Sequence, residues 1–232
     1  MRIIRTNRGI VTLYSYEFIG KGTEATVYRK GSVAYKCYHP IFHTDRLDLE
    51  ETERLEQLST QRILLPRETI YGIRGKFQGY TTRYIEDYGL DNFLHLSTDR
   101  LIQEFHLLKQ DCATLGEHSI FVADFLPDES YYCNYLFHDG IYFFDPGKYY
   151  FDYHYDKDRI TTYNSMMVDS VIYQGAILRV ARRLMPPNQL HPYLQEFEWY
   201  RYHPTGKFTD FLESDMHDKN LEEYVKRKIL KK

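Results

Sequence analysis

The stretch over residues 17–38 constrains the fold of this chain more than any other part of the sequence. Two runs rich in β-forming residues flank a turn around Gly31, and this pattern predicts a β-hairpin. The first run carries Gly20 and Gly22, and the second leads to Lys36. Glycine lets a backbone approach a bound group closely because it has no Cβ. The stretch therefore predicts either an ordinary tight hairpin or one that covers a phosphate-bearing ligand.

Length and composition are those of a globular protein with one large domain or two small lobes. The chain has 232 residues, of which 43% are hydrophobic, and a formal net charge of −3. This near balance of charge gives no reason to expect a nucleic-acid partner. The three cysteines are widely spaced and favour neither a disulfide framework nor a zinc site. Without a signal-peptide core or a run of about 18 apolar residues, we expect a cytoplasmic protein with no membrane partner.

A helix is predicted over residues 45–61. Three leucines fall on one of its faces at helical spacing, namely Leu47, Leu55 and Leu58. Glu51 lies on the same face, and a carboxylate within an apolar stripe is costly unless a cation pairs with it. Glu51 is therefore either paired or placed at the edge of the stripe.

Residues 63–85 are predicted to form two strands around a turn at residues 73–76. The polar, glycine-containing segment 86–92 follows and is the best boundary between two lobes. Beyond it, apolar residues at helical spacing predict a helix over residues 101–115, with Gly116 as its C-cap.

Residues 118–147 hold the second informative block. Two apolar strands, 133–137 and 141–144, flank an Asp-Gly pair that is a hairpin signal. The second strand leads into Asp145, followed by Pro and Gly. An aspartate in this position can act as a turn residue or as a metal ligand that faces a cleft. The last third of the chain is predicted to be helical over residues 162–185, 192–201 and 208–232.

The hairpin resembles the nucleotide-binding hairpin of the protein kinase-like superfamily. Gly20, Gly22 and Val27 match the family pattern G-x-G-x-x-G-x-V, with Ala25 in place of the third glycine. Val-Ala-Tyr-Lys, ending at Lys36, is similar to the family's V-A-I-K.

Later segments carry the same resemblance, which extends over about residues 15–150. Asp124-Phe-Leu-Pro is similar to the D-L-K-P of a kinase catalytic loop, and Asn134-Tyr-Leu is similar to its N-I-L. Phe144-Asp145-Pro-Gly is similar to the metal-binding D-F-G. Within this superfamily, the sequence most resembles bacterial eukaryotic-like Ser/Thr kinases and kinase-related small-molecule phosphotransferases.

The resemblance implies a site for ATP and Mg²⁺, because phosphoryl transfer depends on positioning and charge neutralisation. Lys36 would neutralise phosphate charge, and Glu51 would hold it in place. Asp124 would orient or deprotonate the attacking hydroxyl, while Asn134 and Asp145 would bind Mg²⁺. The alternatives to Glu51 are Glu53 and Glu56. The nucleotide-binding residues would be Gly20, Gly22, Ala25, Val27, Lys36, Thr82, Arg83 and Ile85.

The sequence departs from the family pattern in the catalytic loop. Val122 and Ala123 stand where the family has the His and Arg of H-R-D. Asp124 and Asn134 are also ten residues apart along the chain, whereas the family pattern has five. The segment between them is either an insertion, or Asp128 or Glu129 takes over the role of Asp124.

These observations predict an α+β, bilobal protein kinase-like fold. Its β-rich N-lobe would span residues 1–86, with one helix, and its mostly helical C-lobe residues 87–232. The first hypothesis is an ATP/Mg-dependent phosphotransferase, a small Ser/Thr protein kinase-like enzyme acting on a protein or small-molecule acceptor. The second is a pseudokinase that serves as a nucleotide-binding or protein-interaction module. A non-kinase α+β domain is the third interpretation.

Overall fold

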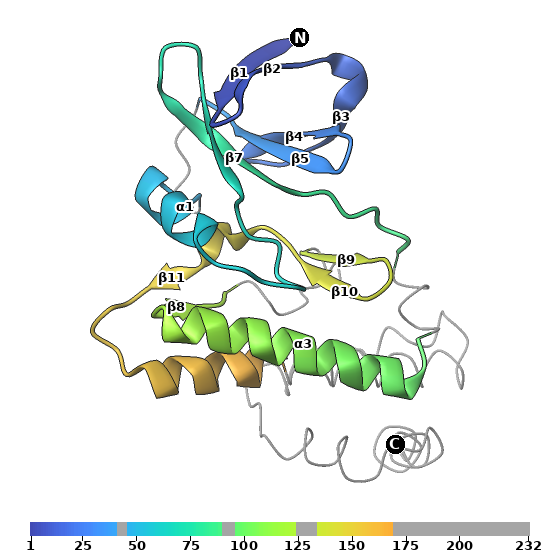
Figure 1. Cartoon of the computed structure of the whole chain (residues 1–232), viewed down its shortest axis with the longest axis vertical. Coiled ribbons are helices and arrows are strands. Elements are labelled where there is room, and N and C mark those ends of the chain that lie inside the picture. Colours follow the sequence, from blue (N-terminus) through green and yellow to red (C-terminus); the bar gives the residue numbers. More distant parts are fainter. Residues whose placement is uncertain (41–45, 90–95, 124–133, 169–232) are drawn as a thin grey trace.

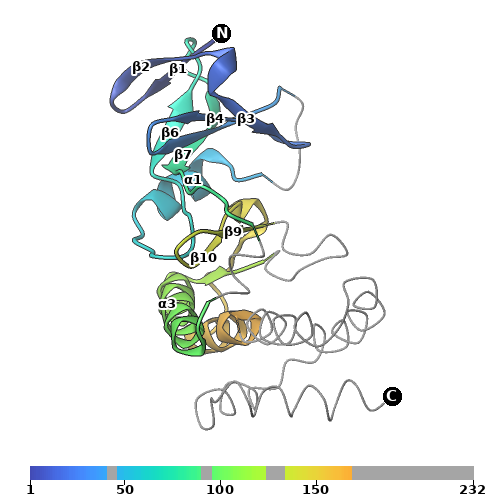
Figure 2. The ribbon, with the colours of Figure 1, turned by 90° about the vertical axis from the view of Figure 1, so that its right-hand side faces the viewer.

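A computed structural model describes residues 1–40, 46–89, 96–123 and 134–168 of the chain. A sheet formed by the first part of the chain lies above a helical region formed by the later part (Figures 1 and 2). Between them lies a small hairpin of strands β9 (Tyr135–Phe137) and β10 (Ile141–Phe143). The coarse prediction of an α+β fold is confirmed.

The large sheet has seven antiparallel strands in the order β2-β1-β6-β7-β5-β4-β3. Successive strands of the chain pair as hairpins, so most of the sheet follows from local turns. The strands are β1 (Arg2–Thr6), β2 (Gly9–Leu13), β3 (Phe18–Lys21), β4 (Ala25–Lys30), β5 (Val33–Tyr38), β6 (Glu68–Tyr71) and β7 (Phe77–Arg83). The hairpin predicted over residues 17–38 is confirmed by the pairing of β4 with β5.

The core of the sheet region forms from side chains of several strands. Its buried members are Ile4, Leu13, Tyr35, Cys37 and Ile70. These side chains come from β1, β2, β5 and β6 and pack together. Their burial stabilises the fold by about 25 cal/mol for each Å² of apolar surface removed from water.

The first helix is shorter than predicted. Helix α1 spans Leu49–Glu56, whereas the sequence predicted residues 45–61. Asp48 is the N-cap: its carboxylate accepts the Glu51 N–H at 2.8 Å, and the Glu51 carboxylate accepts the Asp48 N–H at 2.9 Å. This capping box starts the helix at Leu49 and leaves the buried Leu47 outside it.

Segment 61–65 connects α1 to the sheet and holds the sheet region to the helical region. Arg62 and Leu64 exchange backbone hydrogen bonds with Phe143 of β10, at 2.8 and 2.7 Å. The carboxylate of Asp111, on helix α3 (Thr98–Glu117), accepts the backbone N–H groups of residues 61, 62 and 63. The helix predicted over residues 101–115 is thus confirmed, with Ser97 as its N-cap.

The end of α3 shows why Gly116 is glycine. The predicted C-cap role is wrong, because the helix continues to Glu117 and His118 is the C-cap. A Cβ at Gly116 would collide with Thr161, which belongs to a helix covering residues 157–168. The glycine therefore permits close packing of two helices. This second helix also begins earlier than the predicted residue 162, because the Asp156 carboxylate accepts the Asp158 N–H at its start.

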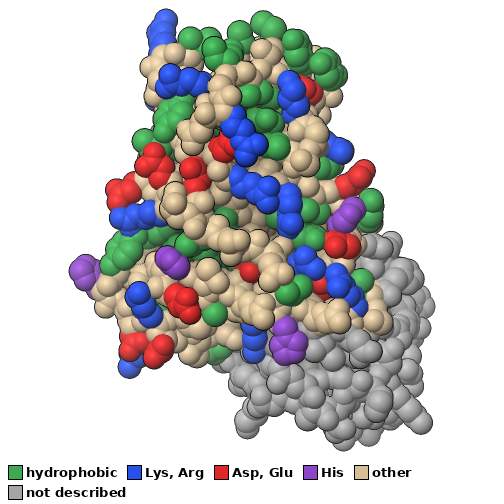
Figure 3. All heavy atoms as spheres, viewed as in Figure 1, with side chains coloured by type: hydrophobic (Ala, Val, Ile, Leu, Met, Phe, Trp, Pro, Cys, Tyr) green, Lys and Arg blue, Asp and Glu red, His purple; other side chains and the backbone are tan. Residues whose placement is uncertain are grey.

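The predicted hairpin of the second block is confirmed by the pairing of β9 with β10. Strand β8 (Ile120–Phe121) pairs with β11 (Tyr150–Phe151), and the 3-10 turn η2 (Pro146–Lys148) follows Asp145. The predicted helices over 192–201 and 208–232 lie outside the described residues. Basic and acidic side chains are interspersed on the face shown in Figure 3. Within the described ranges, no helix is long and apolar enough to cross a membrane.

Candidate functional site

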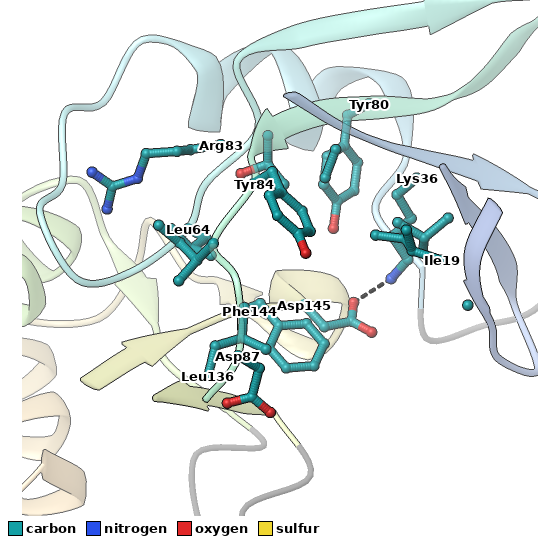
Figure 4. A pocket seen from close by; sticks show the side chains of 15 residues that line it. Ile19, Lys36, Leu64, Tyr80, Arg83, Tyr84, Asp87, Leu136, Phe144 and Asp145 are labelled. Atoms are coloured by element: carbon teal, nitrogen blue, oxygen red, sulfur yellow. Dashed lines mark hydrogen bonds and ion pairs between the residues drawn. The ribbon is translucent and has the colours of Figure 1, made fainter. Parts of the chain in front are cut away.

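A cavity of about 410 Å³ lies between the large sheet and the β9–β10 hairpin (Figure 4). Its volume is within the range of small-molecule sites. It is lined from the sheet by Ile19, Gly20, Val27, Ala34, Lys36, Tyr80, Thr82 and Arg83, and from the connecting segments and the hairpin by Leu64, Tyr84, Ile85, Asp87, Leu136, Phe144 and Asp145. The lining is mostly apolar. Its charged groups are Lys36 and Asp145, which pair with each other, Arg83, which points away from that pair (Figure 4), and Asp87 of the segment after β7.

One side of the cavity is formed by β3 and β4, which are joined by a turn at residues 22–24, called here the glycine turn. The register of this strand pair shifts between Phe18 and Gly20, and the Gly22 N–H donates to the Ala25 carbonyl at 2.9 Å. A Cβ at Gly20 or Gly22 would meet no other atom within 4 Å. Neither glycine is therefore required by packing in this structure, and both leave space above the cavity. Gly20 and Val27 line the cavity, whereas Ala25 is buried opposite Tyr38.

Lys36 lies in the middle of β5 and is only 9% exposed. Its Nζ donates to the Asp145 carboxylate (Figure 4), which lies 109 residues further along the chain, and it lies 3.4 Å from Glu24 Oε2. Burial disfavours the charged amine, but the charge and hydrogen bond of Asp145, together with the charges of Tyr38 and Glu24, outweigh it, and the pKa of Lys36 is raised above its usual value. The lysine is therefore charged at neutral pH.

Two tyrosine rings form the wall behind this lysine. Its Nζ is 5.8 Å from the ring centroids of both Tyr38 and Tyr80, within the range of cation–π attraction. Tyr80 lines the cavity and is fully buried. Burial, together with the charges of Asp145 and Glu24, raises the pKa of Tyr80 well above its ordinary value, so its hydroxyl stays protonated.

Asp145 lies two residues after the end of β10 and adopts a left-handed backbone conformation with φ 64° and ψ 70°. This conformation is costly for a residue other than glycine, and such strain is concentrated at functional sites. Its side chain is 31% exposed and lines the cavity. The Asn134 carbonyl accepts the Phe144 N–H at 3.0 Å, so the chain brings Asn134 next to the residue that precedes Asp145.

The end of β7 and the segment after it form the side of the cavity that holds the predicted nucleotide-binding residues Thr82, Arg83 and Ile85. Thr82 Oγ1 donates to the Leu65 carbonyl at 2.9 Å, and the Tyr84 N–H donates to the Ser32 carbonyl at 2.9 Å. Ile85 lines the cavity, and Arg83 extends away from Lys36 (Figure 4) to donate to the Gln61 carbonyl at 2.8 Å. The backbone at Thr82, Arg83 and Ile85 thus borders the cavity, while the Arg83 guanidinium is committed elsewhere.

The structure does not bring Glu51 to Lys36. The Glu51 carboxylate is committed to the capping box of α1. Of the alternatives, Glu56 accepts the Thr69 hydroxyl, and Glu53 is exposed. Within the part of the chain that the structure describes, the carboxylate that reaches Lys36, besides Asp145, is Glu24 of the glycine turn. Asp124, with Asp128 and Glu129, lies outside the described residues.

Sequence reasoning missed Glu24, Tyr80 and Asp87. Glu24 stands between Gly22 and Ala25, at a variable position of the family pattern. Asp87 belongs to the polar segment 86–92, and its carboxylate accepts the N–H groups of Phe137 and Gly89 and links this segment to β9. Only the position of Glu24 next to the glycines offered a signal.

Among the described residues, no group of three or more His, Cys, Asp or Glu side chains is placed to hold a metal ion. A site with Asp145 as its one carboxylate and Asn134 nearby still fits Mg²⁺, because this ion takes one or two protein carboxylates and fills its remaining positions with water and substrate phosphate. Comparison with known sequences found no matching protein-family model and no matching curated protein.

Proposed function

We propose that this protein is an ATP/Mg-dependent phosphotransferase with a bilobal, protein kinase-like fold. The observation that carries the proposal is the convergence inside one cavity of Lys36, from β5 of the large sheet, and Asp145, from the segment after β10. Phosphoryl transfer requires a fixed cation beside the phosphates and a carboxylate for Mg²⁺. Both groups border an apolar space roofed by Gly20 and Val27.

Each end of the cavity supports a different part of the nucleotide. Ile85 lines one end of the cavity, and among the described residues no hydrogen bond within the protein engages its backbone N–H or carbonyl. These groups are available to the edge of an adenine ring. The end near Lys36 is charged and suits the phosphates. Asn134 and Asp145 would hold Mg²⁺, which neutralises charge on the phosphate oxygens.

In the proposed reaction, the acceptor oxygen forms a bond to the γ-phosphorus while the bond from that phosphorus to the β–γ bridging oxygen breaks. Lys36 holds phosphate oxygens in place, and the hydroxyl proton passes to a carboxylate for which Asp124 is the candidate. A protein or small-molecule hydroxyl is the proposed acceptor class.

One observation favours the alternative of a nucleotide-binding module without turnover. Val122, at the position of the family's histidine, is fully buried, and its N–H donates to the Asn164 Oδ1 at 2.9 Å. This backbone is therefore part of the core and presents no catalytic side chain at Val122.

Thermal unfolding with and without millimolar Mg-ATP tests the proposal. A ligand that binds only the folded state stabilises it by about 2.7 kcal/mol at 100 times its Kd, so the midpoint must rise. We expect this rise for the wild type and for Lys76→Met, an exposed control in the turn after β6. We expect its loss in Lys36→Met and in Asp145→Asn.

The absence of a wild-type rise would refute the nucleotide site. Where the rise occurs, incubation with γ-labelled ATP separates the two functions. Transfer of label to the protein itself, to generic proteins or to small hydroxyl compounds supports the enzyme, whereas binding without transfer supports the binding module.

A further inference from the structure

Among the described residues, two carboxylates neighbour Lys36, and only one of them is accounted for by the proposed function. Asp145 would engage Mg²⁺ when the nucleotide binds, whereas Glu24 Oε2 lies 3.4 Å from the lysine and has no assigned role. We propose that Glu24, carried by the glycine turn, is the residue that positions Lys36 for phosphate binding. This inference rests on the proposed function and gives Glu24 the role that the family pattern assigns to the helix residue Glu51.

The backbone of the glycine turn is fixed on both sides of Glu24. The Glu24 carbonyl accepts the His39 N–H at 2.8 Å. The imidazole of His39 contacts residues before and after Glu24, with Nδ1 3.0 Å from the Thr23 carbonyl and Nε2 3.0 Å from Thr26 Oγ1. His39 therefore contacts Thr23, Glu24 and Thr26 and helps to fix the position from which Glu24 reaches the lysine.

The Glu24 side chain is suited to a lasting contact. It is 18% exposed, and the Lys36 side chain is 11% exposed, so water screens their attraction less than at an open surface. An ammonium has three N–H donors. One carboxylate at Glu24 leaves two of these donors for phosphate oxygens once Asp145 turns to the metal.

Glu51 is poorly placed to take over this role. Its carboxylate and its N–H both take part in the reciprocal capping of Asp48, at 2.9 and 2.8 Å. A swing of Glu51 toward Lys36 would open this capping box, and α1 is only eight residues long. The contact with Glu24 requires no such rearrangement.

Glu24 could also have the opposite role and inhibit nucleotide binding, and a variant without its charge distinguishes the two roles. A carboxylate beside Lys36 could occupy the space of a phosphate group and block it. Removal of its charge would then tighten nucleotide binding, whereas removal of a positioning residue must weaken it.

The experiment compares Glu24→Gln with Glu51→Gln in the full chain. Glutamine preserves the capping box at residue 51, which makes the second variant a matched control. The first measurement needs no nucleotide: the Lys36 ammonium is titrated by NMR of ¹³C-lysine-labelled protein, with Lys36→Arg to assign its signal. We expect the midpoint to fall in Glu24→Gln and to stay unchanged in Glu51→Gln, a result that a merely structural role of Glu24 would not produce.

The second measurement is the Kd of Mg-ATP by calorimetry. We expect about tenfold weaker binding in Glu24→Gln, since the ion pair with Lys36 is reduced to a hydrogen bond from a neutral acceptor, and an unchanged Kd in Glu51→Gln. Tighter binding in Glu24→Gln, or weaker binding in Glu51→Gln alone, would overturn the inference. A Lys36 midpoint that does not respond to Glu24→Gln overturns it as well, even in a protein that binds Mg-ATP. A wild type that binds no Mg-ATP refutes the proposed function instead, and with it the phosphate role of Glu24.

Discussion

The buried carboxylate of Asp111 provides the sharpest stability prediction. Its two oxygens accept the N–H groups of Gln61, Arg62 and Ile63, at 2.9, 2.6 and 2.9 Å. Asp111 is 3% exposed, and burial raises the pKa of its carboxyl despite these hydrogen bonds. The interaction joins α3 to the segment that supplies Leu64 to the cavity.

The perturbation is Asp111→Ala, compared with Asp111→Asn. Alanine removes the acceptor of all three N–H groups. Gln61 is exposed, so water can replace its lost partner, whereas Arg62 and Ile63 are buried. Two buried N–H groups without partners cost about 1–3 kcal/mol each, so we expect a loss of about 2–6 kcal/mol in the free energy of unfolding. For a chain of this length, each kcal/mol lowers the Tm by about 2–4 °C.

Asparagine keeps an oxygen that can accept the N–H groups of Arg62 and Ile63. Burial disfavours the charged carboxylate, so removal of its negative charge costs little. We therefore expect Asp111→Asn to lower the free energy of unfolding by less than about 2 kcal/mol. Urea unfolding followed by circular dichroism measures both values, with Thr114→Ala on the exposed side of α3 as control. An average point mutation lowers the free energy of unfolding by about 1 kcal/mol. A loss in Asp111→Ala no larger than this would refute the reasoning. An Asn variant as unstable as the Ala variant would show that charge, rather than hydrogen bonding, holds the joint.

Three further predictions concern the backbone and the alkaline range. Gly79→Ala is expected to destabilise the fold by at least about 2 kcal/mol, because Gly79 has φ +132° and a Cβ there would collide with the Lys36 carbonyl; a loss below that in urea unfolding would contradict this packing. Ser119→Gly is expected to raise the free energy of unfolding by up to about 1 kcal/mol, since Ser119 has φ 63° after the α3 C-cap, and a lower Tm would show that its side chain is needed. The raised pKa of Lys36 means that the folded state binds its proton more tightly than the unfolded state does. The resulting contribution to the free energy of unfolding is complete below the pKa of Lys36 in the unfolded state, about 10.4, and is lost as the pH rises through its pKa in the folded state. The stability difference between the wild type and Lys36→Met should therefore shrink above about pH 10, and a difference that grows there would reverse the sign of the argument.

The sequence by itself determined the elements that depend on neighbouring residues. The hairpin around Gly31 and the hairpin at Asp139-Gly140 follow from turn residues between β-forming runs, and the structure confirms both. The long helix α3 followed from apolar spacing over many residues. These signals are local, so the chain carries them without reference to its tertiary structure.

The tertiary structure decided which charged groups meet. Glu51 lies at helical spacing among leucines, a pattern that favours a buried pairing, but the side chain of Asp48 starts the helix and engages that glutamate locally. Gly116 had the spacing of a C-cap, yet its role is set by Thr161, 45 residues away in the chain (161 − 116). The pairing of Lys36 with Asp145 and Glu24 depends on how the sheet, the glycine turn and the β9–β10 hairpin pack. Contacts between distant segments depend on the whole packing arrangement, and no short stretch of sequence encodes them.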